Sequence, residues 1–181
     1  MIAEGLYLFG VCWLLAQLEI QIEGGHGWAE KLPTWKMDDA WILRLHNGRP
    51  LTGYHFYFIT FLLAIFHLPI LFTGFSLPVE VRILSYFFLT AVFWDFQWFV
   101  WNPAWGVRRF RGEPVWWFPK KILGFPLEYF TGIAASLLIP LIFWPAFVAQ
   151  WCALFLILLT ASAASVAAAE WSGWRPKGAL R

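Results

Sequence analysis

The sequence predicts an all-α fold: a polytopic membrane helix bundle with about five transmembrane helices and a short interfacial helix. Of its 181 residues, 60% are hydrophobic, 21% are aromatic and only 13% are charged. This composition is too apolar for the surface of a water-soluble domain. Several apolar runs also reach the roughly 20 residues that a helix needs to cross a bilayer core about 30 Å thick. Residues 1–181 are therefore expected to form a single transmembrane domain.

Each expected span follows from an apolar run and its boundaries. No Lys or Arg precedes the first run, which therefore lacks the basic region of a secretory signal and is kept as a span. The last apolar tract, 127–171, is about twice as long as one span needs to be, and the pair Trp144-Pro145 predicts a turn at the headgroups within it. Because the segment around this turn is itself apolar, a re-entrant or tilted hairpin stays open as an alternative. The expected spans are 2–22, 54–75, 79–101, 127–144 and 149–171.

The distribution of basic residues predicts the orientation. With five spans and the N-terminus outside, the cytoplasmic segments are 23–53, 102–126 and 172–181, and these contain all thirteen Lys and Arg residues except Arg82. The positive-inside rule favours this arrangement, in an inner membrane, with the C-terminus in the cytoplasm.

The first two cytoplasmic segments are expected to lie in the membrane interface. Residues 34–48 have early acidic residues, apolar residues at helical spacing and a terminal glycine, which predicts the short interfacial helix. Segment 102–126 mixes tryptophans with basic residues that are expected to meet anionic lipid headgroups. The basic residues of that segment are Arg108, Arg109, Arg111, Lys120 and Lys121.

A candidate polar site follows from ionisable side chains at membrane depth, which are costly there and are functional candidates by default. Glu19 and Glu23 lie one helical turn apart at the inner end of the first span, and His55 opens the second span at the same level. Asp95 lies in the inner half of the third span, with Trp98 and Asn102 following on its own helical face. Asp95 is expected to face the bundle interior rather than lipid.

A metal is one interpretation of this polar site. Glu23 and His26 have the Glu-x-x-His spacing of di-iron proteins, but Gly24 and Gly25 disfavour the helix that this spacing requires. Carboxylates and imidazoles suit iron, manganese or zinc, and the alternative is that the carboxylates meet headgroups, Arg or water. The candidate ligands are Glu19, Glu23, His26, His55 and Asp95. No particular metal or cofactor is assigned.

Other polar features allow two interpretations each. The loop after the first span could close His26 and Trp28 over the site, or form only a turn that leads to the interfacial helix. His67 is expected near the membrane centre, where it could ligate a pigment or another cofactor, and Pro69 nearby is expected to kink the helix. Rows of small residues in the fifth span, including Ala164 and Ala168, could pack within this bundle or against partner subunits or a second copy.

Two segments resemble those of a family of small, uncharacterised prokaryotic integral membrane proteins. They are EIQIEGGHGWAEKLPTW, from Glu19 to Trp35, and WDFQWFVWNP, from Trp94 to Pro103. The resemblance includes the intervening PLTGYHFYF and covers roughly the first two thirds of the chain. It implies no established activity, and no functional residue is carried over from it.

Three functions remain in competition. The first is a membrane subunit or binding protein that packs against partner helices, lipid or a hydrophobic cofactor, as the fourteen tryptophans suggest. The second is a membrane-embedded enzyme, with or without a metal, that acts on an apolar or lipidic substrate at the cytoplasmic boundary. The third is a small-solute transporter, although the chain has no evident inverted repeat. Membrane lipids are the expected partners, and the small net charge of +2 argues against nucleic acid.

Overall fold

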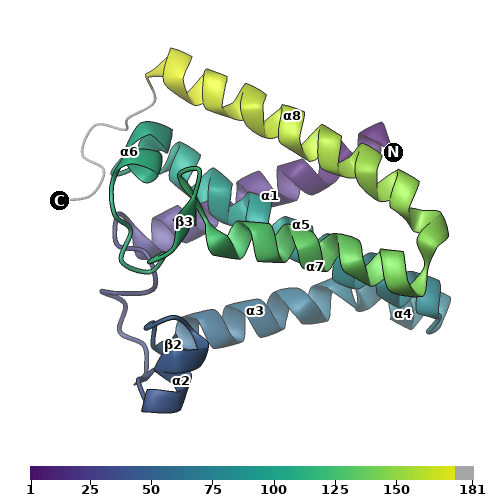
Figure 1. Ribbon diagram of the computed structural model, residues 1–181, viewed down its shortest axis with the longest axis horizontal. Helices are drawn as coiled ribbons and strands as arrows, with labels where there is room; N and C mark the ends of the chain where they lie inside the picture. The colour runs from purple at the N-terminus through teal and green to yellow at the C-terminus, as the bar shows by residue number, and fades with distance from the viewer. Residues whose placement is uncertain (174–181) are drawn as a thin grey trace.

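The computed structural model describes residues 1–173 and is mainly helical. Figure 1 shows its long helices running side by side. The only strands among the described residues form two short antiparallel pairs, β1 with β2 and β3 with β4. The helices are α1 (Ile2–Glu23), α2 (Ala40–Leu45), α3 (Gly53–Phe66), α4 (Leu68–Thr73), α5 (Leu77–Trp101), α6 (Gly106–Gly112), α7 (Leu127–Phe143), the 3-10 turn η1 (Pro145–Phe147) and α8 (Val148–Ser172). The strands are β1 (Lys36–Met37), β2 (Leu51–Thr52), β3 (Lys121–Ile122) and β4 (Phe125–Pro126).

Four helical stretches are long and apolar enough to cross a membrane, as expected for a membrane protein. They are Ile2–Glu23, Gly53–Thr73, Leu77–Trp101 and Pro145–Ser172. The helix expected as the fourth span, α7, is also apolar but has 17 residues and is shorter than the usual length of a span. The exact number of spans therefore stays a prediction.

α5 is the central helix, because α1, α7 and α8 all pack against it. α3 and α4 stand apart on the other side of the bundle (Figure 1). Only 6% of the most apolar stretch of Gly53–Thr73 is buried inside the protein, compared with 44% for α5. α3 and α4 therefore present most of their apolar surface to their surroundings.

Hydrogen bonds between side chains fix the rotation of α8 relative to α5, which apolar packing alone would leave free. Gln97 Nε2 donates to Ser162 Oγ at 3.2 Å, and Ser165 Oγ donates to Gln97 Oε1 at 2.7 Å, so α5 and α8 are joined at a buried point. Ser165 also accepts from Trp101 Nε1 at 2.8 Å. Of the small residues in α8, Ser165 thus faces the bundle, whereas Ala164 and Ala168 are exposed. Packing of those two alanines against a partner stays a prediction.

The connections differ from the expectation in detail. The interfacial helix of segment 34–48 is confined to the six residues of α2, because β1 and β2 pair on either side of it. The second span breaks at His67 between α3 and α4, beside the expected kink at Pro69, whereas Pro140 lies inside the continuous helix α7.

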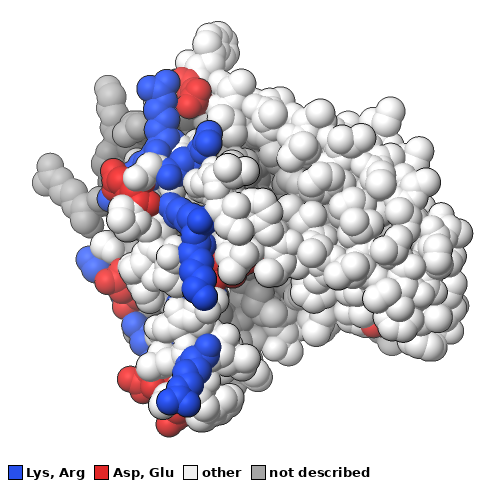
Figure 2. Space-filling model, viewed as in Figure 1, with Lys and Arg blue, Asp and Glu red and all other residues white. Residues whose placement is uncertain are grey.

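Charged side chains gather at one end of the bundle. Figure 2 shows the Lys and Arg residues of this face along the edge formed by α2, α6 and β3. We call this end, covered by segments 23–53 and 102–126, the basic end. The expected third cytoplasmic segment, 172–181, lies outside the described residues from position 174 onward.

Aromatic side chains fill the basic end and anchor its loops to α5. Phe99, which is fully buried, stacks on Phe110 of α6 with ring centroids 4.0 Å apart. Trp105 and Trp117 lie against the same ring at 5.4 Å and 6.1 Å. Segment 102–126 is therefore a packed cap rather than a loose loop.

Candidate functional site

The candidate site lies at the basic end, where α1 ends and α3 begins. α1 places Glu19 and Glu23 one turn apart on the same helical face, and both are buried, with exposed fractions of 6% and 7%. α3 carries His55 in its first turn. One ligand atom from each of the three side chains lies within 4.8 Å of the other two. We call these three residues the acid–histidine cluster.

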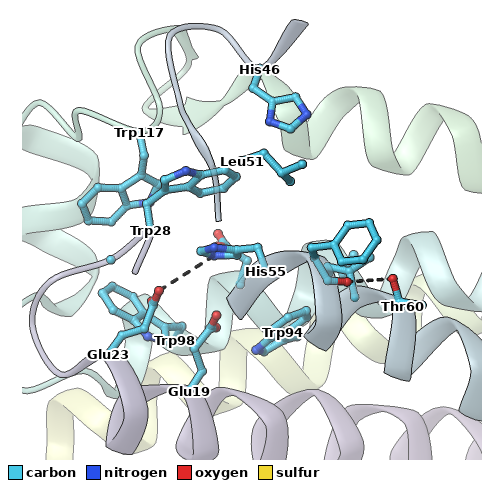
Figure 3. A pocket seen from close by; sticks show the side chains of 15 residues that line it. Glu19, Glu23, Trp28, His46, Leu51, His55, Thr60, Trp94, Trp98 and Trp117 are labelled. Atoms are coloured by element: carbon cyan, nitrogen blue, oxygen red, sulfur yellow. Dashed lines mark hydrogen bonds and ion pairs between the residues drawn. The ribbon is translucent and has the colours of Figure 1, made fainter. Parts of the chain in front are cut away.

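Neighbouring groups hold each member of the cluster in place. Thr52 caps α3, because its Oγ1 accepts the backbone N–H of His55 at 3.2 Å and also lies 2.8 Å from His55 Nδ1. The other ring nitrogen, Nε2, consequently faces Glu23, 3.8 Å from its Oε1 (Figure 3). The hydroxyl of Tyr54 donates to Glu19 Oε1 at 3.5 Å.

The loop after α1 has a strained backbone that supports Glu23. Trp28 and Ala29 have φ angles of 60° and 51°, in the left-handed region that residues with a Cβ rarely adopt. This conformation brings the N–H of Ala29 to 2.5 Å from Glu23 Oε1. Strain of this kind persists only where surrounding contacts enforce it, and it is concentrated at functional sites.

Trp28 covers the acid–histidine cluster. Its ring stacks on His55 with centroids 4.4 Å apart, and its Nε1 donates to the carbonyl of Pro50 at 2.8 Å. Gly27 lets the loop pass close to Trp117, since a Cβ at this position would lie 2.4 Å from the indole. His26 does not join the acid–histidine cluster: it is exposed, and its Nδ1 lies 3.9 Å from Glu30 Oε2.

A pocket of about 390 Å³ opens beside the cluster, bounded by α1, α3, α5 and the covering loops. Its ionisable wall includes Glu19, Glu23, His55 and Asp95, and with Trp98 the structure brings five of the seven predicted site residues to one cavity. α3 packs sparsely against α5, and this leaves room for the pocket. Apolar and aromatic side chains make most of the remaining wall, among them Phe56, Ile59, Ala91, Trp94, Trp98 and Trp117. The three tryptophans are labelled in Figure 3.

Asp95 faces the interior, but its hydrogen-bond partner comes from an unexpected helix. It accepts a hydrogen bond from the hydroxyl of Tyr129 in α7 while also lining the pocket. Asn102, which was expected to share this site, instead fastens the loop after α1, donating from Nδ2 to the carbonyl of Gly24 at 2.7 Å. Trp98 does line the pocket, beside Asp95.

The carboxylates of the pocket have no Lys or Arg partner among the described residues. Among residues 1–173, no Lys or Arg lies within 4.0 Å of the carboxylates of Glu19, Glu23 or Asp95. The guanidinium of Arg49 interacts electrostatically with Asp95, but its ion pair, at 3.1 Å, is with Glu128 instead. Buried carboxylates in this situation need a proton or a cation to offset their desolvation.

Arg49 joins the site to segment 102–126 and α7. Its guanidinium lies 4.4 Å from the ring centre of Trp28, and its Nε donates to the carbonyl of His46 at 2.8 Å. Burial lowers the pKa of Arg49, and the charges of Glu128 and Asp95 oppose this effect. Burial and the charge of Arg49 also lower the pKa of His46, which favours its neutral form.

His67 is engaged away from the cluster. Its Nε2 lies 3.1 Å from Glu80 at the start of α5, and its Nδ1 lies 2.7 Å from the carbonyl of Leu63. Both ring nitrogens thus have protein partners, and a pigment would have to displace one of them.

Most of the residues expected at lipid headgroups make contacts within the protein. Arg108 is 3.8 Å from Glu170, Arg109 is 2.7 Å from Glu113, and the guanidinium of Arg111 lies 5.4 Å from the ring of Phe125. Lys121 donates to the carbonyl of Phe110, and burial lowers its pKa, whereas Lys120 is exposed. Their binding to headgroups stays a prediction.

Several residues of the site were not predicted from the sequence. Arg49, Thr52 and Tyr54 lie within six residues before His55 in the chain. A polar, aromatic sequence around a histidine at the start of an apolar helix could therefore have indicated them. Tyr129 had a weaker signal, since only its position at the start of an apolar helix beside Glu128 distinguished it. No family model, curated protein or solved structure matches this chain.

Proposed function

We propose that this protein binds an amphiphilic, lipid-like molecule in the pocket between α1, α3 and α5. The observation that carries the proposal is the pocket itself, which is apolar along most of its wall and polar at the acid–histidine cluster. Binding sites for small molecules commonly combine an apolar lining with a few convergent polar groups. An amphiphile would place its chain among the apolar side chains and its polar end at the carboxylates.

The position of α3 supports entry of such a ligand from the membrane. α3 makes few contacts with α5 and buries little of its apolar surface. A ligand that is already dissolved in the bilayer could therefore pass beside α3 without crossing water.

Filling the pocket tests the proposal. Ile59, which lines the pocket from α3, is replaced by tryptophan, and Ile65, an exposed residue of the same helix, is replaced in the same way as the control. Ile59→Trp is expected to reduce co-purified lipid to less than about one tenth, because a full side chain would overlap the ligand. Ile65→Trp is expected to leave it unchanged. Native mass spectrometry from mild detergent measures the bound lipid.

Two results would count against the proposal. One is wild-type protein that carries no stoichiometric amphiphile after purification and binds none from bacterial lipid extract. The other is an equal loss of bound lipid in both variants, since this would locate the lipid on the outer surface of α3.

The proposal includes the location and orientation of the chain. We propose a multi-pass inner-membrane protein with five spans, α7 being the fourth, with its N-terminus outside and its basic end in the cytoplasm. The gathering of Lys and Arg at the basic end supports this orientation (Figure 2). Reporter fusions at the two termini are expected to give opposite signals, and fusions that report the same side would favour an even number of spans.

A membrane-embedded enzyme is the second candidate. Carboxylates and an imidazole around one pocket, with Tyr129 bonded to Asp95, are the groups that acid–base chemistry employs. Bound lipid would then be substrate rather than a permanent ligand, and its conversion by purified protein would distinguish the two.

A further inference from the structure

We propose that Glu19, Glu23 and His55 bind one divalent transition-metal ion, such as zinc, manganese or iron(II). This inference rests on the proposed function only for location, because the ion would occupy the polar end of the same pocket. Two carboxylates and one imidazole form a donor set that suits these metals.

The geometry requires little movement to accept an ion. The three ligand atoms already lie within 4.8 Å of one another. Ligand atoms about 2.1 Å from a shared ion are roughly 3 to 4.2 Å apart, so a contraction of about 1 Å would complete the set. The pair His55 Nε2 and Glu23 Oε1 is already at 3.8 Å.

The surroundings of the ligands have the features of a metal site. The contact of His55 Nδ1 with Thr52 Oγ1 at 2.8 Å leaves Nε2 as the ring nitrogen that faces the carboxylates. In metal-binding histidines, the ring nitrogen that does not bind the metal usually makes a hydrogen bond of this kind. Glu23 is held in turn by the N–H of Ala29. These contacts would orient the ligands before the ion arrives.

The two buried carboxylates of the cluster favour binding of a cation. Glu19 and Glu23 are buried side by side, and no Lys or Arg in the described part of the chain pairs with either. A divalent ion would neutralise both carboxylates at once, at a depth where an uncompensated charge is expensive.

An unpaired donor points independently to a ligand. Trp98 is 3% exposed and lines the same pocket, and its indole N–H has no hydrogen-bond acceptor among residues 1–173. Figure 3 labels both Trp98 and Glu23 among the side chains that line the pocket. Three protein ligands leave an open position on the ion, and an oxygen bound there could accept this N–H. The polar end of the amphiphile is thus expected to carry such an oxygen.

Cobalt(II) binding tests the inference on the full-length protein in detergent. After treatment with EDTA, the wild type is expected to bind one Co²⁺ per chain, with the visible absorption of a low-symmetry site. His55→Gln and Glu23→Gln are expected to weaken binding about 100-fold or more, because each removes a ligand and even indirect partners are worth 10- to 100-fold. His26→Gln is the matched control, since His26 is exposed and outside the cluster, and should bind as the wild type does.

Absence of saturable Co²⁺ binding by the wild type would overturn the inference, as would an equal loss in His26→Gln and His55→Gln. Circular dichroism and thermal unfolding establish that each variant is folded. If His55→Gln or Glu23→Gln does not fold, Glu19→Gln takes its place as the ligand-removing variant. Ile59→Trp separates the two proposals. In that variant, cobalt binding that persists after the lipid is lost supports both proposals. Cobalt binding by a wild type that carries no amphiphile supports the metal site alone, whereas lipid binding by a wild type that takes no cobalt retains only the proposed function.

Discussion

Replacing Arg49 with methionine is expected to lower the free energy of unfolding by about 3 kcal/mol. Arg49 is 9% exposed, and its guanidinium lies 3.1 Å from Glu128 and 4.4 Å from the ring centre of Trp28. Removing one partner of a buried ion pair leaves the other charge uncompensated, which typically costs about 3 to 5 kcal/mol. We expect a loss at the lower end of this range, because the side chain of Glu128 is 27% exposed and water can reach it.

Unfolding in detergent, followed by near-ultraviolet circular dichroism, measures the loss. The matched control is Arg44→Met, because Arg44 is exposed and takes part in no ion pair within the described residues. A second change, Glu128→Gln in the Arg49→Met protein, should restore part of the stability by removing the orphaned charge. Equal stability of Arg44→Met and Arg49→Met would contradict the assignment of Arg49 as a structural link.

Truncating Phe99 to alanine is expected to cost about 3 to 5 kcal/mol, as for other large aromatic side chains in cores. Phe99 is fully buried and stacks on Phe110 of α6, with Trp117 against the same ring. A cavity at this position would loosen α6 and the connection 113–120 from α5. Since Trp117 also lines the pocket, bound lipid should decrease with the stability.

Phe61→Ala serves as the control, because Phe61 on α3 is 60% exposed and its loss should change stability by about 0.5 kcal/mol or less. Thermal unfolding and lipid content are measured on both variants. If Phe99→Ala unfolds like the wild type, segment 102–126 does not depend on the aromatic packing that the structure assigns to it.

The sequence was most informative about features that depend on neighbours along the chain. Hydropathy over 20 residues located the long helices, because lipid accepts only continuous apolar segments with internally satisfied backbones. The same local reasoning predicted a common depth for Glu19, Glu23, His55 and Asp95, since depth follows from position along a helix. The one-turn spacing of the two glutamates also determined that they share a face.

The sequence was least informative about contacts between helices. Position along a helix does not say which way that helix is turned or which neighbour it meets, so the bond between Asp95 and Tyr129 was not predicted. The loop after α1 was equally undetermined. Trp28 covers the cluster and His26 points outward because Arg49, Pro50 and Trp117, from elsewhere in the chain, hold the loop in a left-handed conformation.

The sequence by itself thus determined an all-α fold with long apolar helices, and it predicted a basic end with four ionisable side chains near it. Only the tertiary structure decided that Glu19, Glu23 and His55 meet, that Asp95 lines the same cavity, and that α3 stands away from α5 to leave it open. The physical reason is that burial and helix formation are governed by local sequence, whereas helix rotation and separation are set by side chains that interlock across the bundle.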